Sequence, residues 1–170
     1  MNLHRLAQQR AAAGRPVRVG LIGAGKFGSM FLAQAPRMAG VEVAVIADLD
    51  PERARAACRT VGWDPVRIAK TAFVASGAEA CAHPEVEVVV EATGVPAAGI
   101  VHARAAIGAK KHIVMVNVEA DVLAGPLLAE EARADGVVYS LSRSLLPARG
   151  PSTCRPITRS RRTMSGPLTA

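Results

Sequence analysis

The chain has 170 residues, half of which are hydrophobic, and a formal net charge of +7. This length fits about one domain, and no apolar run is long enough to span a membrane. The segment 143–170 holds six of the 21 basic residues and no acid, which leaves 15 basic against 14 acidic residues in the rest of the chain. Because the excess charge belongs to this segment, it does not indicate a basic groove for nucleic acid.

The segment 1–15 is basic and has no acidic residue. That composition leaves a transit peptide open, but we expect a short amphipathic helix that leads into the first strand. The three cysteines, Cys58, Cys81 and Cys154, are widely spaced and form no Cys-x-x-Cys pair. Their pattern favours a reducing compartment, which we take to be the cytoplasm, and predicts no structural metal site.

The stretch 17–30 predicts a strand, a glycine turn and the start of a helix. Residues 17–22 are largely apolar and β-branched, as in a buried parallel strand. Glycines follow at G-x-G-x-x-G spacing, at Gly23, Gly25 and Gly28. In this motif the first permits a tight turn, the second lets a pyrophosphate approach the backbone, and the third lets the helix pack against the strand. The free N–H groups at the start of the helix then face the phosphates.

A second strand at 41–47 is followed by Asp48, which lies 20 positions after Gly28. An acidic residue at this point accepts hydrogen bonds from the adenosine ribose, so the sequence predicts a dinucleotide cofactor. Asp48 favours NAD because it repels a 2′-phosphate, whereas Arg53 and Arg55 in the next helix attract one and favour NADP. The pattern therefore leaves the choice between NAD and NADP open.

The rest of the chain up to residue 142 alternates between helices and strands. Asp50-Pro51-Glu52 is a helix start. The pattern then predicts a helix to about residue 61, a turn at 62–65, a strand within 68–74, a helix at 77–82, a strand at 86–91, a helix at 96–106, a strand at 112–116, a helix at 125–134 and a strand at 137–141. We expect Asp121 to precede and cap the helix at 125–134.

This alternation predicts an α/β fold, a doubly wound parallel sheet of the Rossmann type with helices on both faces and strand order 3-2-1-4-5-6. Ligand is expected at the carboxyl ends of the strands. The chain is expected to divide into an N-terminal helix over 1–15, a dinucleotide-binding domain over 16–142 and a basic irregular tail over 143–170. The tail has four prolines, no acid and no apolar period.

Three runs resemble the nucleotide-binding domain of homoserine-dehydrogenase-like oxidoreductases: residues 17–28, Glu91-Ala92-Thr93-Gly94, and residues 111–121. The chain resembles most the deoxyxylulose-phosphate-reductoisomerase-like branch, which carries a SAF-type domain further on and uses NADPH, and residues 114–121 are typical of that branch. The resemblance covers residues 1–142. It implies that the family's substrate domain follows there, so we expect this chain to be truncated, or shifted in reading frame, before that domain.

The resemblance also implies the residues of the cofactor site. The pyrophosphate is held by Gly23, Gly25, Lys26, Phe27 and Gly28. Asp48 faces the adenosine ribose, Asn117 lies near the nicotinamide, and the dinucleotide is lined by Ala92, Thr93 and Gly94. Homoserine dehydrogenases carry a catalytic lysine directly after the asparagine, whereas this chain has Val118. The resemblance therefore identifies no catalytic acid–base residue.

The function that the resemblance implies is that of an NAD- or NADP-dependent dehydrogenase or reductase, inactive as this chain alone. A small-molecule substrate would bind once a second domain or a second subunit, as in a homo-oligomer, completes the site. The alternative is a non-catalytic nucleotide-binding module or remnant. Neither hypothesis requires nucleic acid or a membrane as a partner, and a complete substrate domain after residue 142 would separate the two.

Overall fold

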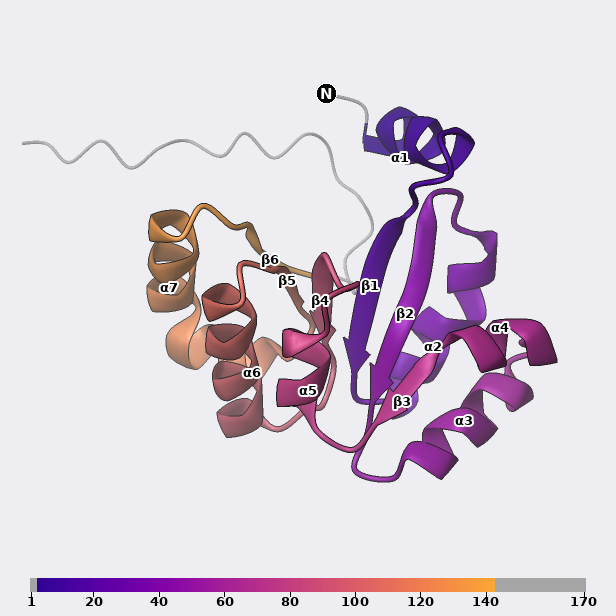
Figure 1. Cartoon of the computed structure of the whole chain (residues 1–170). Helices are drawn as coiled ribbons and strands as arrows, with labels where there is room; N and C mark the ends of the chain where they lie inside the picture. The colour runs from indigo at the N-terminus through magenta and orange to yellow at the C-terminus, as the bar shows by residue number, and fades with distance from the viewer. Residues whose placement is uncertain (1–2, 143–170) are drawn as a thin grey trace, which may run out of the picture.

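The computed structural model describes residues 3–142, which form a six-stranded sheet with helices on both faces (Figure 1). The strands are β1 (Val17–Ile22), β2 (Val41–Ala47), β3 (Ala72–Val74), β4 (Val88–Glu91), β5 (His112–Met115) and β6 (Tyr139–Leu141). All pairs are parallel, and the order is β3-β2-β1-β4-β5-β6. The predicted doubly wound Rossmann fold and its strand order are therefore confirmed.

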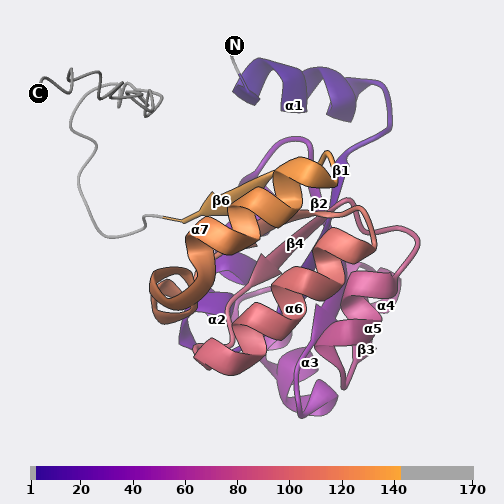
Figure 2. The ribbon, with the colours of Figure 1, turned by 90° about the vertical axis from the view of Figure 1, so that its left-hand side faces the viewer.

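The two faces of the sheet carry separate hydrophobic cores. One face is covered by α2 (Lys26–Gln34), the 3-10 turn η1 (Ala35–Arg37), α3 (Pro51–Thr60) and α4 (Pro65–Lys70). The other is covered by α5 (Gly77–Ala82), α6 (Pro96–Gly108) and α7 (Val118–Ala134). Figure 2 shows α6 and α7 running side by side over this second face. Both β1 and β2 send side chains into each core, for example Leu21 and Ile46 into one and Ile22 and Val45 into the other. Burial on both faces explains why the two strands are nearly continuous apolar runs.

β1 and β2 begin and end where the sequence predicts, whereas β4, predicted at 86–91, begins at Val88. Leu21 in β1 and Val45 and Ile46 in β2 have no solvent exposure, and burial on both sides favours their β-branched and aliphatic side chains. Because β1 and β4 are neighbours while β2 lies on the other side of β1, the connections diverge at the carboxyl ends of β1 and β4. Ligands of open parallel sheets bind at this switch point.

Two helices differ from the sequence prediction. Asp64 begins α4 by accepting a hydrogen bond from the N–H of Arg67 at 2.8 Å, where the pattern predicts a turn and part of a strand. α7 begins at Val118 rather than at residue 125, because the Asn117 side chain accepts the N–H of Ala120 at 3.1 Å. The prediction that Asp121 precedes and caps this helix is wrong.

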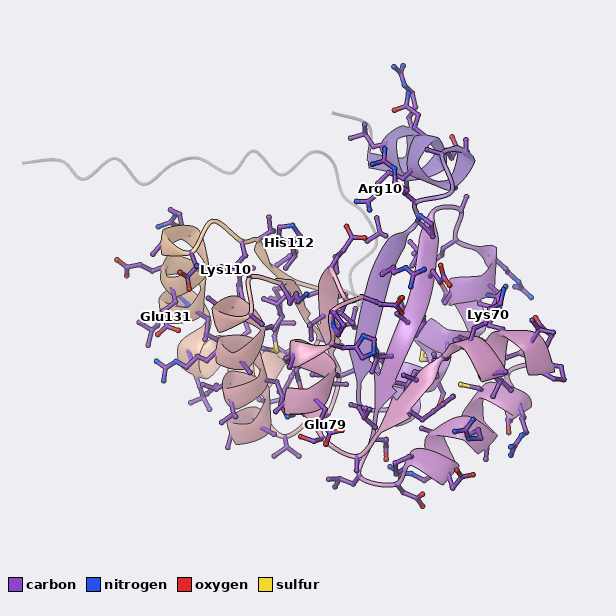
Figure 3. The ribbon with its side chains drawn as sticks, viewed as in Figure 1. Arg10, Lys70, Glu79, Lys110, His112 and Glu131 are labelled. Atoms are coloured by element: carbon purple, nitrogen blue, oxygen red, sulfur yellow. The ribbon has the colours of Figure 1, made fainter. Side chains whose placement is uncertain are left out.

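The N-terminal helix α1 (Leu3–Ala12) lies beyond the amino ends of the strands (Figure 1). Arg10 reaches from it to the Glu87 carboxylate at 2.8 Å (Figure 3). No helix among the described residues has the length and apolar character needed to cross a membrane. The expected tail at 143–170 lies outside the described residues.

Candidate dinucleotide-binding site

The glycine turn after β1 has the shape that a bound pyrophosphate requires. Gly23 has φ of +94°, and a Cβ there would lie 2.8 Å from the carbonyl oxygen of Ala92. A Cβ on Gly28 would lie 2.1 Å from the Gly23 carbonyl oxygen, so only glycine lets α2 pack this closely. At Gly25, which caps α2, a Cβ would meet nothing within 4 Å. This open space at a helix N-terminus is a cradle that a phosphate fits and that a side chain would fill.

Asp48 lies directly after β2, and hydrogen bonds hold its carboxylate in place. One oxygen accepts the N–H of Ala24 at 2.9 Å, and the other accepts the N–H of Asp50 at 3.1 Å and the Arg53 guanidinium at 2.7 Å. Burial by itself would raise the pKa of Asp48, but the bonds from Arg53, Asp50 and Ala24 outweigh it and lower that pKa. The acid is therefore held as a carboxylate that ties the glycine turn to the start of α3.

The loop after β4 is organised around Glu91, whose side chain is fully buried. Its Oε1 atom accepts the N–H of Thr93 at 3.2 Å and the Thr93 hydroxyl, and it lies 3.5 Å from Nδ1 of His102 on α6. Gly94 follows with φ of +71°. Thr93 is thus fixed beside the glycine turn.

These loops meet at a cavity of about 200 Å³ at the carboxyl ends of the strands. It is lined by Ile22, Gly23, Gly25, Ala47, Asp48, Leu49, Arg53, Ala75, Gly77, Ala92, Thr93, Val95 and His102. Five of the predicted site residues are therefore brought together: Gly23, Gly25, Asp48, Ala92 and Thr93. In Figure 3, Glu79 marks the end of the molecule where α5 borders this region, whereas Arg10 and His112 lie toward the opposite end.

The other predicted site residues lie outside the cavity lining. Lys26, Phe27 and Gly28 belong to the first turn of α2, and Gly94 lies next to Thr93 in the β4 loop. Asn117 is 3% exposed, and its side chain caps α7. Asn117 follows β5 and so lies at the carboxyl ends of the strands, as predicted. Its side-chain oxygen Oδ1, however, already accepts the N–H of Ala120 in α7.

Sequence reasoning missed seven cavity residues, namely Ile22, Ala47, Leu49, Ala75, Gly77, Val95 and His102. Ala75 and Gly77 follow the three-residue strand β3, which is too short to give a periodic signal. His102 sits inside a helix, where packing is the ordinary role of the side chain. Its place against Gly77 comes from tertiary contact: a Cβ on Gly77 would lie 2.4 Å from Nε2 of His102.

A larger cavity of about 360 Å³ lies elsewhere, beside the first residues of β2. Its walls include Trp63, Arg67, Lys70 and Thr71, and it contains none of the predicted site residues. The predicted site residues that line a cavity therefore all lie at the smaller one. Within residues 3–142 no group of three His, Cys, Asp or Glu side chains is arranged to hold a metal ion.

The comparisons with known proteins agree with this geometry. The family model described as an oxidoreductase family with an NAD-binding Rossmann fold matches residues 17–116. The chain belongs to this family. The matched residues include the glycine turn, Asp48 and the β4 loop, so the dinucleotide prediction, NAD or NADP, is confirmed at the level of the domain. No curated protein matches the chain.

Solved structures show the same fold in several oxidoreductases. An NAD binding oxidoreductase from Klebsiella pneumoniae is 23% identical with TM-score 0.61, over 75% of this chain and 34% of its own length. Myo-inositol dehydrogenase from Lactobacillus casei, in complex with NAD(H) and myo-inositol, is 21% identical with TM-score 0.61, over 75% of this chain and 36% of its own length. A homoserine dehydrogenase from Thiobacillus denitrificans is 24% identical with TM-score 0.63, over 75% of this chain and 29% of its own length. The chain spans about a third of the length of these proteins.

Proposed function

We propose that residues 16–142 are the cofactor-binding half of an NAD(P)-dependent dehydrogenase or reductase that resembles the homoserine dehydrogenases. The observation that carries this proposal is the open cradle at Gly25, between the positive-φ turn at Gly23 and the tight contact at Gly28. The finer assignment to the deoxyxylulose-phosphate-reductoisomerase-like branch rests on the run 114–121, which the family match covers only up to residue 116.

The described residues supply binding and orientation in this proposal. The N–H groups at the start of α2, with Lys26, Phe27 and Gly28, hold the pyrophosphate, and Asp48 and Arg53 face the adenosine ribose. Ala92, Thr93 and Gly94 line the opposite wall, with Asn117 toward the nicotinamide. The bound cofactor supplies the hydride chemistry, while the protein fixes its position and its electrostatic surroundings.

We further propose that the cofactor is NADP(H). Both oxygens of the Asp48 carboxylate are already engaged by protein donors, and Arg53, which pairs with it, is 64% exposed at the cavity. A carboxylate neutralised in this way repels a 2′-phosphate less, and the exposed guanidinium supplies charge-assisted donors to it. The cytoplasm fits the protein best, because Cys58 and Cys81 are free thiols within the described chain.

The non-catalytic alternative is favoured by one observation. Val118, which occupies the position of the catalytic lysine in homoserine dehydrogenases, is 49% exposed in the first turn of α7. No proton donor or acceptor therefore occupies this position. A second domain or subunit, including one in a homo-oligomer, would have to supply the acid–base group and the small-molecule site.

Calorimetric titration of NADPH and NADH into wild-type protein and Gly25→Val tests the proposed function. Because a Cβ at this position meets nothing within 4 Å, we expect the valine side chain to enter the cradle, and circular dichroism checks that the variant is folded. We expect the affinity to fall at least about a hundredfold, since the phosphate loses several backbone hydrogen bonds. Gly108→Val, at the open end of α6, is the control. Equal binding by wild type and Gly25→Val would exclude this site.

A further inference from the structure

Glu91 contacts two of the side chains that line the dinucleotide cavity but does not itself line it. A fully buried carboxylate is costly unless donors satisfy it. Oε1 is satisfied by the N–H and the hydroxyl of Thr93, with His102 Nδ1 at 3.5 Å. Thr93 and His102 both form part of the cavity wall. The position of that wall therefore depends on a buried acid behind it.

The second oxygen of Glu91 borders a small polar gap. Glu91 Oε2 and Asn117 Nδ2 are both buried, and neither has a hydrogen-bond partner among the described residues. Each lies 3.1 Å from the position that a Cβ on Gly99 would occupy. An acceptor at the end of β4 and a donor at the end of β5 thus lie near the same point without meeting, and a small side-chain rotation would close the gap between them.

We propose that Glu91 is a positioning residue for the dinucleotide site, an inference that rests on the proposed function. Oε1 fixes Thr93 and His102 at the cavity wall, and Oε2 orients the amide of Asn117 across the gap beside Gly99. The partners that the structure gives to Glu91 with an assigned role are both donors, the N–H and the hydroxyl of Thr93. The Asn117 amide group, unpaired among the described residues, is the donor that Oε2 would face in this proposal. Glutamine keeps the shape of the side chain but replaces one carboxylate oxygen with an NH₂ group. Because NH₂ cannot accept a hydrogen bond, it would face either the Thr93 donors or the Asn117 amide without pairing.

Glu91→Gln is the direct test, and Tyr139→Phe is its matched control. Tyr139 donates to Asp121 at 2.8 Å on the same side of the sheet and lies outside the cavity. Dissociation constants for NADPH and NADH are measured by nicotinamide fluorescence, at a temperature where circular dichroism shows each variant folded. We expect Glu91→Gln to weaken binding about tenfold, as expected when a charge-assisted contact is lost. Tyr139→Phe should lower Tm and leave the affinity unchanged.

A second pair of variants decides the question if Glu91→Gln does not fold. In Gly99→Ala the new methyl group presses on Glu91 Oε2, Asn117 Nδ2 and Ala120 Cβ, while alanine favours the helix. In Gly108→Ala, on the same helix, the methyl group meets nothing within 4 Å. We expect Gly99→Ala to weaken dinucleotide binding severalfold and to shift the backbone amide resonance of Thr93. Gly108→Ala should change neither.

The outcomes separate this inference from the proposed function. Wild-type protein that binds neither dinucleotide would overturn both. If wild type binds, and Glu91→Gln or Gly99→Ala binds with wild-type affinity while folded, Glu91 is a structural residue only and the positioning role is wrong. Loss of affinity in proportion to loss of Tm, seen equally in Tyr139→Phe, would lead to the same conclusion.

Discussion

The proposed preference for NADP(H) depends on Arg53, whose guanidinium pairs with Asp48 at 2.7 Å. We expect Arg53→Ala to weaken NADPH binding about tenfold, because the 2′-phosphate loses a charge-assisted donor, while NADH binding changes little. Calorimetric titration of both cofactors measures the preference. Arg55, whose guanidinium lies over the Phe73 ring at 4.2 Å, does not line the cavity, and Arg55→Ala is the control. An unchanged ratio of the two affinities in Arg53→Ala would contradict the NADP assignment.

Asp48 also links the stability of the fold to pH. Its pKa in the folded protein lies below the ordinary value of 3.8. The ionised form is therefore favoured by folding, and this contribution is present above pH 3.8 and lost as the pH falls through the folded pKa. We expect Asp48→Asn to be less stable than wild type at pH 7, with the difference shrinking toward pH 3, as measured by urea unfolding. Glu52→Gln, which removes an exposed carboxylate from the nearby helix α3, is the control.

At the scale of single elements, α4 depends on its N-cap residue, Asp64. The helix has six residues, and Asp64 caps it through the N–H of Arg67 at 2.8 Å. Removing a cap from a helix this short exposes orphan N–H groups that no other turn can satisfy. We expect Asp64→Ala to lower Tm by about 3 °C, and Asp64→Ser, which keeps a capping oxygen, to restore most of it. A scanning calorimetry trace unchanged in Asp64→Ala would show that tertiary contacts alone hold α4.

The elements that the sequence predicts well are those with a strong local signal. β1, β2 and α5 begin and end as predicted, because apolar runs and capping residues mark their ends. The start of α7 was misplaced because Gly125-Pro126 looks like a helix start. In the structure Pro126 lies inside the helix, where Asn117 provides the cap a full two turns earlier.

The residues of the candidate site likewise divide into those that the sequence predicts and those that only the packing of the elements brings together. The glycines and Asp48 follow from spacing alone, since their roles depend on local backbone geometry. His102 and the Glu91–Asn117 gap do not, because they arise where α6 crosses the ends of β4 and β5. Residues brought together only by the packing of α5, α6 and α7 leave no periodic trace in the chain.

At the scale of the whole molecule, binding and turnover should separate. Hydride transfer needs substrate held at about 3–3.5 Å from the reacting carbon and a positioned acid or base. Residues 3–142 form a single sheet, which in this proposal supplies only the cofactor side of the active site. Val118 offers no acid–base group there. The solved oxidoreductases that share this fold are about three times as long as their matched part. The remainder of each chain is long enough to form the substrate side of an active site.

We therefore expect the purified 170-residue chain to bind NADP(H) by calorimetry and to show no oxidation or reduction across a panel of 2-hydroxy acids, aldehydes and sugar acids. Absorbance at the nicotinamide band measures turnover, and light scattering establishes whether the sample is monomeric. A monomer with robust turnover would mean that the described residues hold a complete active site, contrary to this prediction. Turnover confined to an oligomeric fraction would instead show that a second subunit supplies the missing wall, because proximity to a partner's side chains is the only change between the two samples.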